Sequence, residues 1–273
     1  MKILVLAHRL EVGGTQVNAI ELSAYLRNRY GHEISYLATP GPMNALLEEN
    51  GLRFLTLPDA SSHPSYRRIR AIDEAINSEH PDVVHIWDWP QWLDAFLGVH
   101  LYRRVPTVVT CMSMVVPSVL PRWSKTTFGT PDIVEQAQSM GYRDSHLLMP
   151  PVDTVLNAAD PAASRQFRDE HGVADKDILI VTVSRLVDWM KAESLRLTME
   201  AIQALRHDER LKFAVIGDGS SRGELEELAN RINSEIGRKA IFFTGAMLDP
   251  RPGYAAADIV VGMGGSGLRG MAF

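Results

Sequence analysis

The segment ILIVTVSRLVDWMK, residues 178–191, decides the fold, and it opens with six apolar or β-branched residues. Such a run predicts a strand that is buried on both faces. A polar loop with Ser184, Arg185 and Lys191 follows. Beyond the loop, apolar residues recur at helical spacing at Leu195, Met199, Ile202 and Leu205. In a strand–loop–helix unit, the backbone N–H groups at the start of the helix can bind an anion. The cations Arg185 and Lys191 in the same loop favour a diphosphate as that anion. Solvated loop cations are an equally good interpretation of this segment alone.

The composition excludes several classes of protein. The chain has 273 residues, 45% of them hydrophobic and 22% charged, as in an ordinary globular protein with two domains or one large one. A net charge of −5 gives no support to a nucleic-acid partner. The single Cys111 cannot form an internal disulfide and fits a reducing compartment. No apolar run approaches the roughly 20 residues of a membrane span. We therefore predict a cytoplasmic protein, with peripheral contact at the inner membrane face left open.

Strands and helices alternate through the first part of the chain. The apolar periodicity predicts strands at residues 3–7, 33–38, 53–57, 82–87, 106–110 and 146–149. It predicts helices from Thr15 as N-cap, over 43–50, 65–79 and 91–102, and from Pro131. Strands separated by helices in this way indicate a parallel sheet that is covered on both faces.

The pattern then breaks and restarts. Pro150, Pro151 and residues 157–163 are rich in helix and strand breakers, which predicts an interdomain crossing. After a helix near residues 164–171, strands are predicted at 178–183, 211–216, 240–244 and 259–261, with a helix over 223–235. The fold class is therefore α/β, with two doubly wound, Rossmann-like parallel-sheet domains, 1–155 and 156–273. Ligands of such a pair are expected in a cleft between the domains, at the carboxyl ends of the strands.

Several short motifs occur in a characteristic order. They are Gly13-Gly14-Thr15-Gln16, Pro151-Val152-Asp153-Thr154, Ser184-Arg185-Leu186 with Lys191, Ile216-Gly217-Asp218-Gly219, Phe243-Thr244-Gly245 and Tyr254-Ala255-Ala256-Ala257-Asp258. Together they make the chain resemble the GT-B fold glycosyltransferases of family 4, the "group 1" type, along essentially its whole length. The resemblance implies a retaining, hexosyltransferase-type enzyme that moves a sugar from a nucleotide-diphosphate sugar to an acceptor hydroxyl. It implies that the enzyme needs no bound metal and no cofactor. It also implies a glycan, a lipid-linked molecule or a small molecule as the acceptor.

The resemblance also assigns the donor site. Arg185 and Lys191 would stabilise the departing nucleoside diphosphate. The remaining donor-binding residues would be the glycines and polar residues of the strand-end loops: Gly13, Gly14, Gly217, Asp218, Gly245, Gly264, Gly265 and Ser266. Turn geometry alone is the alternative explanation of the glycines.

Acceptor chemistry is predicted after the strand 82–87. His85 would contact the donor sugar or assist the acceptor hydroxyl, although a hydrogen-bonded core histidine explains it as well. Asp88 is the better-placed general base, and an N-cap of the next helix is its alternative role. Nearby Trp87, Trp89 and Trp92 would form a sugar-stacking wall, or would pack internally.

The basic run Arg67, Arg68 and Arg70 would face anionic lipid or a charged acceptor, or would form a solvated helix face.

The chain departs from the family pattern in two places. Val261 and Arg269 occupy the positions of a usual pair of glutamates, and Arg269 would meet a phosphate or an acidic donor sugar instead. Four strands are predicted after the crossing where about six are usual. We therefore expect an incomplete second domain and a missing C-terminal segment. Three alternatives stay open: a non-catalytic nucleotide- or glycan-binding relative, an inactive fragment, and a nucleotide-sugar epimerase.

Overall fold

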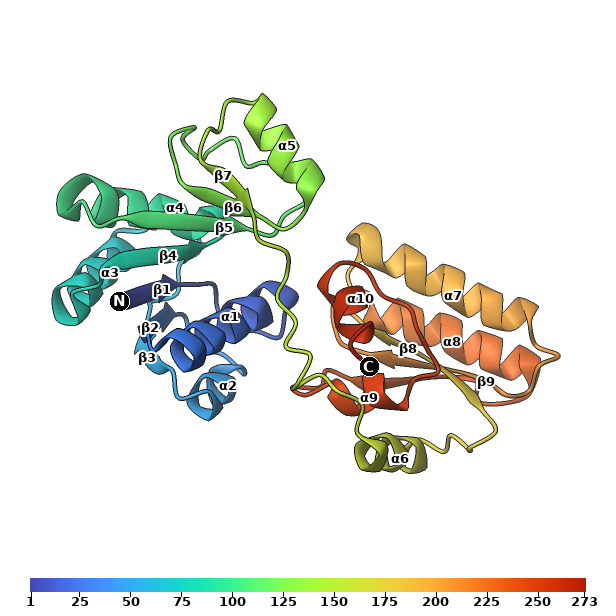
Figure 1. Ribbon diagram of the computed structural model, residues 1–273. Helices are drawn as coiled ribbons and strands as arrows, with labels where there is room; N and C mark the ends of the chain where they lie inside the picture. The colour runs from blue at the N-terminus through green and yellow to red at the C-terminus, as the bar shows by residue number, and fades with distance from the viewer. The chain divides into compact units, whose positions relative to one another are not determined.

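The protein folds into two compact units, Met1–Pro151 and Val152–Phe273. The computed structural model describes the chain except for residues 98, 102, 189 and 190. Each unit has one parallel sheet with helices on both faces (Figure 1). The predicted α/β class with two doubly wound parallel sheets is thereby confirmed.

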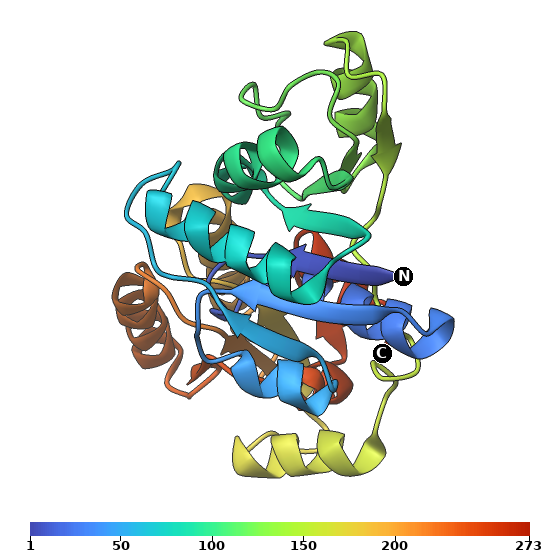
Figure 2. The same ribbon diagram turned by 90° about the vertical axis from the view of Figure 1, so that its left-hand side faces the viewer.

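The N-terminal unit contains a seven-stranded sheet in the order β3-β2-β1-β4-β5-β6-β7. Its strands are β1 (Lys2–Leu6), β2 (Glu33–Ala38), β3 (Arg53–Thr56), β4 (Val83–Trp87), β5 (Thr107–Cys111), β6 (Thr126–Phe128) and β7 (Ser145–Leu147). Its helices are α1 (Gly14–Tyr30), α2 (Asn44–Glu49), α3 (Tyr66–Glu79), α4 (Trp89–Ala95), the π-helical η1 (Phe96–Arg103) and α5 (Pro131–Ser139). Figure 2 shows α3 lying along the sheet next to the strands.

The central strand β1 explains why this sheet is parallel. Leu4 and Leu6 are buried in a core beneath α3, α4 and α5, while Ile3 and Val5 are buried in a second core beneath α1 and α2. A strand with apolar side chains on both faces needs helices on both faces, and crossover connections supply them.

The C-terminal unit contains a four-stranded parallel sheet in the order β10-β9-β8-β11. Its strands are β8 (Ile178–Val183), β9 (Leu211–Ile216), β10 (Ile241–Gly245) and β11 (Ile259–Val260). Its helices are α6 (Pro161–Glu170), the π-helical η2 (Asp188–Ala192), α7 (Glu193–Ala204), α8 (Arg222–Ile236), α9 (Arg251–Ala256) and α10 (Gly265–Gly270). One core lies beneath α7 and α8, and the other lies beneath α6 and α9.

Three details differ from the sequence prediction. Helix α1 begins at Gly14 and has Gly13 as an N-cap without a side-chain hydrogen bond, so the prediction of Thr15 as N-cap is wrong. Strand β6 is absent from the prediction because its three residues are too few for a visible alternation. Lys191 lies in the π-helical η2 rather than in a loop, because Ala192 N donates to the Val187 carbonyl five residues earlier.

Candidate functional site

The loops after three neighbouring strands of the C-terminal unit are joined at the carboxyl edge of the sheet. Ser184 N donates to Ile216 O at 3.0 Å, which binds the loop after β8 to the end of β9. Gly217 N donates to Gly245 O at 2.9 Å and joins the ends of β9 and β10. These bonds gather the sequence-predicted residues Ser184, Gly217 and Gly245 at one edge, as expected for parallel strands.

Close backbone contact accounts for two of the predicted glycines. A Cβ atom on Gly217 would lie 1.8 Å from Ser184 O, and one on Gly219 would lie 2.2 Å from Leu186 O. Both glycines also have positive φ angles, 150° and 157°. The two loops could not lie this close with any other residue at these positions, so packing explains these glycines without a ligand.

Two cations at this edge, Arg185 and Lys191, have no neutralising partner among the described residues. Arg185 is exposed and Lys191 is half-buried. Burial lowers the pKa of Lys191, and the positive charge of Arg185 lowers that pKa further, which places the two cations near each other. Neither side chain forms an ion pair or hydrogen bond with the residues that the structure describes. Neighbouring cations differ, since Arg196 pairs with Glu224 and Arg222 pairs with Asp218.

Asp218 is held firmly in the loop after β9. Its Oδ1 accepts from Gly219 N at 2.8 Å, and its Oδ2 accepts from Arg222 at 3.0 Å. The backbone hydrogen bond from Gly219, followed by the hydrogen bond from Arg222, holds the pKa of Asp218 below its usual range. The carboxylate therefore braces the glycine loop, and any role in nucleotide binding stays a prediction.

The loop after β11 joins the same edge through Ser266. The hydroxyl of Ser266 donates to Val183 O, the last residue of β8, at 2.7 Å. The Tyr254 hydroxyl donates to Ser266 O at 3.2 Å. Gly264 is the N-cap of α10 and Gly265 is the first residue of that helix, so both lie beside the end of β8.

Arg269 lies on α10 and contacts the segment that leads into the C-terminal unit. Its guanidinium donates to Asn157 Oδ1 at 2.9 Å, and Asn157 is buried. The hydrogen bond from Arg251 lowers the pKa of Asp249, and the charge of Arg269 lowers that pKa further. Burial raises the pKa of Tyr254, and the charge of Arg269 opposes that rise. Whether Arg269 meets a phosphate or an acidic sugar stays a prediction.

In the N-terminal unit, Gly13 and Gly14 lie at the start of α1, beyond the end of β1. A Cβ atom on Gly14 would meet nothing within 4 Å. Gly13 has a φ of −168°, which any residue adopts. Neither observation requires a glycine at these positions for a left-handed turn, in contrast to Gly217 and Gly219. Whether the pair binds a ligand at the start of α1 stays a prediction.

His85 has the contacts of a hydrogen-bonded core residue. Its Nε2 lies 2.7 Å from Thr110 Oγ1, which lies 2.7 Å from Thr127 Oγ1. Burial lowers the pKa of His85 to about 4, so the imidazole is neutral near pH 7. The core interpretation accounts for these contacts, and a catalytic role for His85 stays a prediction.

Asp88 occupies the end of β4 in an unusual backbone conformation. Its φ is 73°, and its Oδ1 accepts from Trp89 N at 2.8 Å, so it is the N-cap of α4. Its other oxygen, Oδ2, lies 3.4 Å from His8 Nε2. His8 follows β1 just as Asp88 follows β4, and it is not among the residues predicted from the sequence. Its place after the first predicted strand was the signal that could have identified it.

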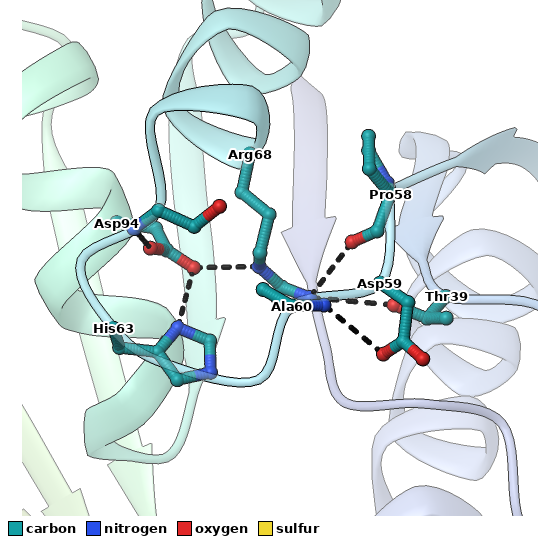
Figure 3. A network of polar contacts seen from close by, with 8 residues as sticks. Thr39, Pro58, Asp59, Ala60, His63, Arg68 and Asp94 are labelled. Atoms are coloured by element: carbon teal, nitrogen blue, oxygen red, sulfur yellow. Dashed lines mark hydrogen bonds and ion pairs between the residues drawn. The ribbon is translucent and has the colours of Figure 1, made fainter.

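The basic run on α3 does not form one solvated face. Arg68 is 4% exposed, and its Nε donates to the buried Asp94 at 2.6 Å (Figure 3). Asp94 also contacts His63 Nδ1 at 2.8 Å, which joins the loop before α3 to α4. Arg70 pairs with Glu74 in solvent. A buried ion pair in place of a lipid-facing cation makes the surface interpretation wrong for Arg68.

The three tryptophans of the predicted sugar-stacking wall also differ in burial. Trp87 and Trp92 are buried in different cores, while Trp89 is 41% exposed. Internal packing therefore accounts for Trp87 and Trp92, and Trp89 alone faces solvent at the start of α4.

No group of three His, Cys, Asp or Glu side chains among the residues that the structure describes could hold a metal ion. Within the same residues, no helix has the length and apolar character needed to span a bilayer.

Comparisons with known proteins identify two family matches and many structural relatives. Residues 12–140 match Glycosyltransferase Family 4, and residues 177–268 match Glycosyl transferases group 1. A glycosyltransferase from Rickettsia africae has 18% sequence identity and a TM-score of 0.77 over 99% of this chain and 77% of that one. Anabaena HepE in complex with UDP-glucose has 17% identity and a TM-score of 0.74 over 95% and 73%.

The third relative is UDP-GlcNAc 2-epimerase from Neisseria meningitidis, bound to UDP-GlcNAc, with 12% identity and a TM-score of 0.62 over 97% and 78%. No curated protein gives a significant sequence match. At these identities the structural relatives establish the fold alone, and the two family matches establish the family.

Proposed function

Because the chain belongs to the glycosyltransferases of the family 4, group 1 type, we propose that it transfers a sugar from a nucleotide-diphosphate sugar to an acceptor hydroxyl. The donor would bind at the carboxyl edge of the four-stranded sheet, through the loops after β8, β9, β10 and β11. The presence of UDP-glucose in the complex of HepE supports a nucleotide sugar as the donor.

The unpaired cations Arg185 and Lys191 carry this proposal. A nucleoside diphosphate gains negative charge as it leaves the sugar, and preorganised cations stabilise that charge most where water is partly excluded. Lys191 is half-buried and its pKa is lowered, so its ammonium form is destabilised in the free protein. A bound anion would stabilise that ammonium form. Two protein cations at the leaving group support a reaction without a metal ion.

The finer parts of the proposal follow from the family. We propose a hexosyl donor and retention of configuration at the transferred carbon, with Asp88 receiving the acceptor's proton. Asp88 suits this role because its Oδ1 is fixed by Trp89 N while other lone pairs of the carboxylate remain available.

A panel of UDP-, GDP- and ADP-sugars, assayed for binding and for slow donor hydrolysis, tests the proposed function. We expect at least one nucleotide sugar to bind and to release its sugar with unchanged configuration. Binding without any turnover would favour a non-catalytic relative instead. A changed sugar stereochemistry in the recovered nucleotide sugar would favour an epimerase, the activity named for the Neisseria relative.

Lys191 makes nucleotide binding depend on pH. The pKa of Lys191 is lowered in the free protein, and a bound diphosphate would raise it, because an anion favours the ammonium form. Binding should therefore take up a proton, and affinity should fall as the pH rises from about 7 to about 10. Lys191→Arg keeps the charge throughout this range. Calorimetric titrations with a nucleoside diphosphate should show a steeper loss of affinity for the wild type than for Lys191→Arg.

Any ionisation of the nucleotide itself affects both proteins equally, so the difference between their profiles isolates Lys191. Identical profiles would exclude Lys191 from the diphosphate site.

The exposed apolar loop between β5 and β6 is the surface that we expect to make the peripheral membrane contact. Between β5 and β6, Met114, Val115, Val119 and Trp123 are each 42–61% exposed. Buried Val116 and Leu120 anchor this loop, and the Tyr142 hydroxyl donates to Leu120 O at 2.8 Å. An anchored loop that holds apolar side chains in water, including a tryptophan, is typical of a surface that inserts at a lipid interface.

We expect this loop to bind vesicles that contain anionic phosphatidylglycerol, since it also carries the exposed cation Arg122. Val115→Asp should lower vesicle binding in a flotation assay by about fivefold or more. Leu197→Asp on α7 is the matched control, because Leu197 is 56% exposed and lies in the other unit. Equal binding by wild type and Val115→Asp would refute the membrane contact of this loop.

A further inference from the structure

His8 and Asp88 come together from adjacent strands. β1 pairs with β4 in parallel register, with Leu6 opposite Ile86, so both chains leave the sheet side by side. His8 Nε2 then lies 3.4 Å from Asp88 Oδ2, and each side chain is about one quarter exposed, 25% and 24%. This partly buried pair lies at the carboxyl edge, where α/β sheets bind their ligands.

The surroundings of Asp88 fix its carboxylate in one place. Its backbone N donates to Thr110 O at 2.8 Å, and its Oδ1 accepts from Trp89 N at 2.8 Å. Its φ of 73° is unfavourable for a residue with a side chain, so these contacts must outweigh the backbone strain. With Oδ1 fixed by the helix cap, Oδ2 is the oxygen that His8 can reach.

The burial of the imidazole determines which nitrogen of His8 carries the hydrogen. His8 Nδ1 is buried and has no hydrogen-bond partner among the residues that the structure describes. A buried N–H without an acceptor costs more than a buried lone pair next to apolar atoms. The hydrogen therefore belongs on Nε2, the ring nitrogen that lies 3.4 Å from Asp88 Oδ2.

Other charged groups near the pair are accounted for. Arg9, the next residue, pairs with Asp59 and with Glu11. On the adjacent β5, burial raises the pKa of the Cys111 thiol, and the negative charge of Asp88 raises that pKa further. Cys111 therefore remains a neutral thiol beside the Asp88 carboxylate, and His8 is the polar donor that faces Oδ2.

We propose that His8 is a positioning residue that holds Asp88 as the base for the acceptor hydroxyl, an inference that rests on the proposed transfer reaction. In that step the acceptor oxygen bonds to the sugar carbon, and the bond from that carbon to the diphosphate oxygen breaks. The diphosphate leaves with the electron pair, and the acceptor's proton moves to the Asp88 carboxylate. His8 donates its Nε2 hydrogen to Oδ2 and prevents the carboxylate from rotating.

The test compares His8→Ala and His8→Gln in steady-state transfer assays. Glutamine can place a neutral N–H donor toward Asp88, whereas alanine cannot. We expect His8→Ala to lower kcat about tenfold or more with the donor KM unchanged, and His8→Gln to restore kcat to within about threefold of the wild type. His146→Ala is the matched control, because His146 Nε2 lies 2.8 Å from Asp144 in a surface pair.

A kcat of His8→Ala equal to that of the wild type would overturn the inference. So would a His8→Gln variant as slow as His8→Ala, because a lost packing contact would then explain both.

A second measurement separates this inference from the proposed function. Side-chain ¹⁵N NMR of the histidines reports the tautomer whether or not the protein turns over a nucleotide sugar. We expect the Nε2–H tautomer for His8 in the wild type and a changed Nε2 shift in Asp88→Ala. If no sugar is transferred while this signature is present, the proposed function fails and the pair stands. An Nδ1–H tautomer or an imidazolium near pH 7 would overturn the pair itself.

Discussion

Replacing both Arg185 and Lys191 with alanine is expected to lower kcat/KM for the donor by about 10³-fold or more. The two cations lie close enough for the charge of Arg185 to lower the pKa of Lys191. Without them, the leaving diphosphate would face a backbone edge with no counter-charge. Removal of one such electrostatic contact commonly costs about 10²- to 10³-fold in rate, and contacts that act as a unit do not add.

The single variants should each show most of this loss, measured as donor hydrolysis or transfer at several donor concentrations. The folded state should change little, since neither side chain has a partner among the described residues. Arg206→Ala with Lys239→Ala is the matched control, because it removes two exposed positive charges that precede β9 and β10. A kcat/KM of Arg185→Ala with Lys191→Ala within about threefold of this control would remove the basis of the proposed function.

Gly217→Ala is expected to abolish nucleotide binding and to destabilise the C-terminal unit. The new Cβ atom would lie 1.8 Å from Ser184 O, so the loops after β8 and β9 must separate. Separation breaks the bonds from Ser184 N to Ile216 O and from Gly217 N to Gly245 O. The free energy of unfolding should fall by about 2 to 4 kcal/mol, through overpacking and lost hydrogen bonds.

Gly223→Ala is the control for this prediction. Gly223 lies in the first turn of α8, and a Cβ atom there would meet nothing within 4 Å. Alanine should leave nucleotide binding unchanged and raise the free energy of unfolding by about 0.5 to 1 kcal/mol. Urea denaturation of both variants measures the free energy of unfolding, and nucleotide titration measures their affinity for the nucleotide. Wild-type affinity in Gly217→Ala would show that the joined loops are not the binding surface.

Apolar periodicity was sufficient to predict the fold, because most strands have a local apolar pattern. The strands β2, β8 and β9 consist mainly of apolar residues, and their predicted and observed bounds coincide. The short β6 escaped notice because three residues cannot display a period. The N-cap of α1 was predicted two residues too late, because threonine favours this position, whereas the observed N-cap Gly13 has no side chain to form a hydrogen bond.

The candidate site was predictable only as far as strand ends could be located. Knowing that Arg185 follows β8 and Gly217 follows β9 places both at one edge, and the structure brings them together there. The pairing of His8 with Asp88 depends on the register between β1 and β4, which no local pattern contains. Arg68 was misjudged for the same reason, because its partner Asp94 lies 26 residues away on another helix.

A crystal structure of the protein with a bound nucleoside diphosphate tests the central claim most directly. The account predicts that the diphosphate oxygens lie within hydrogen-bond distance of both Arg185 and Lys191, at the joined loops of the four-stranded sheet. An open groove between α8 and β10, lined by Asn230, Arg238 and Phe243, is a separate cavity in which a nucleotide has room. A diphosphate in that groove, with both cations left in solvent, would contradict the account.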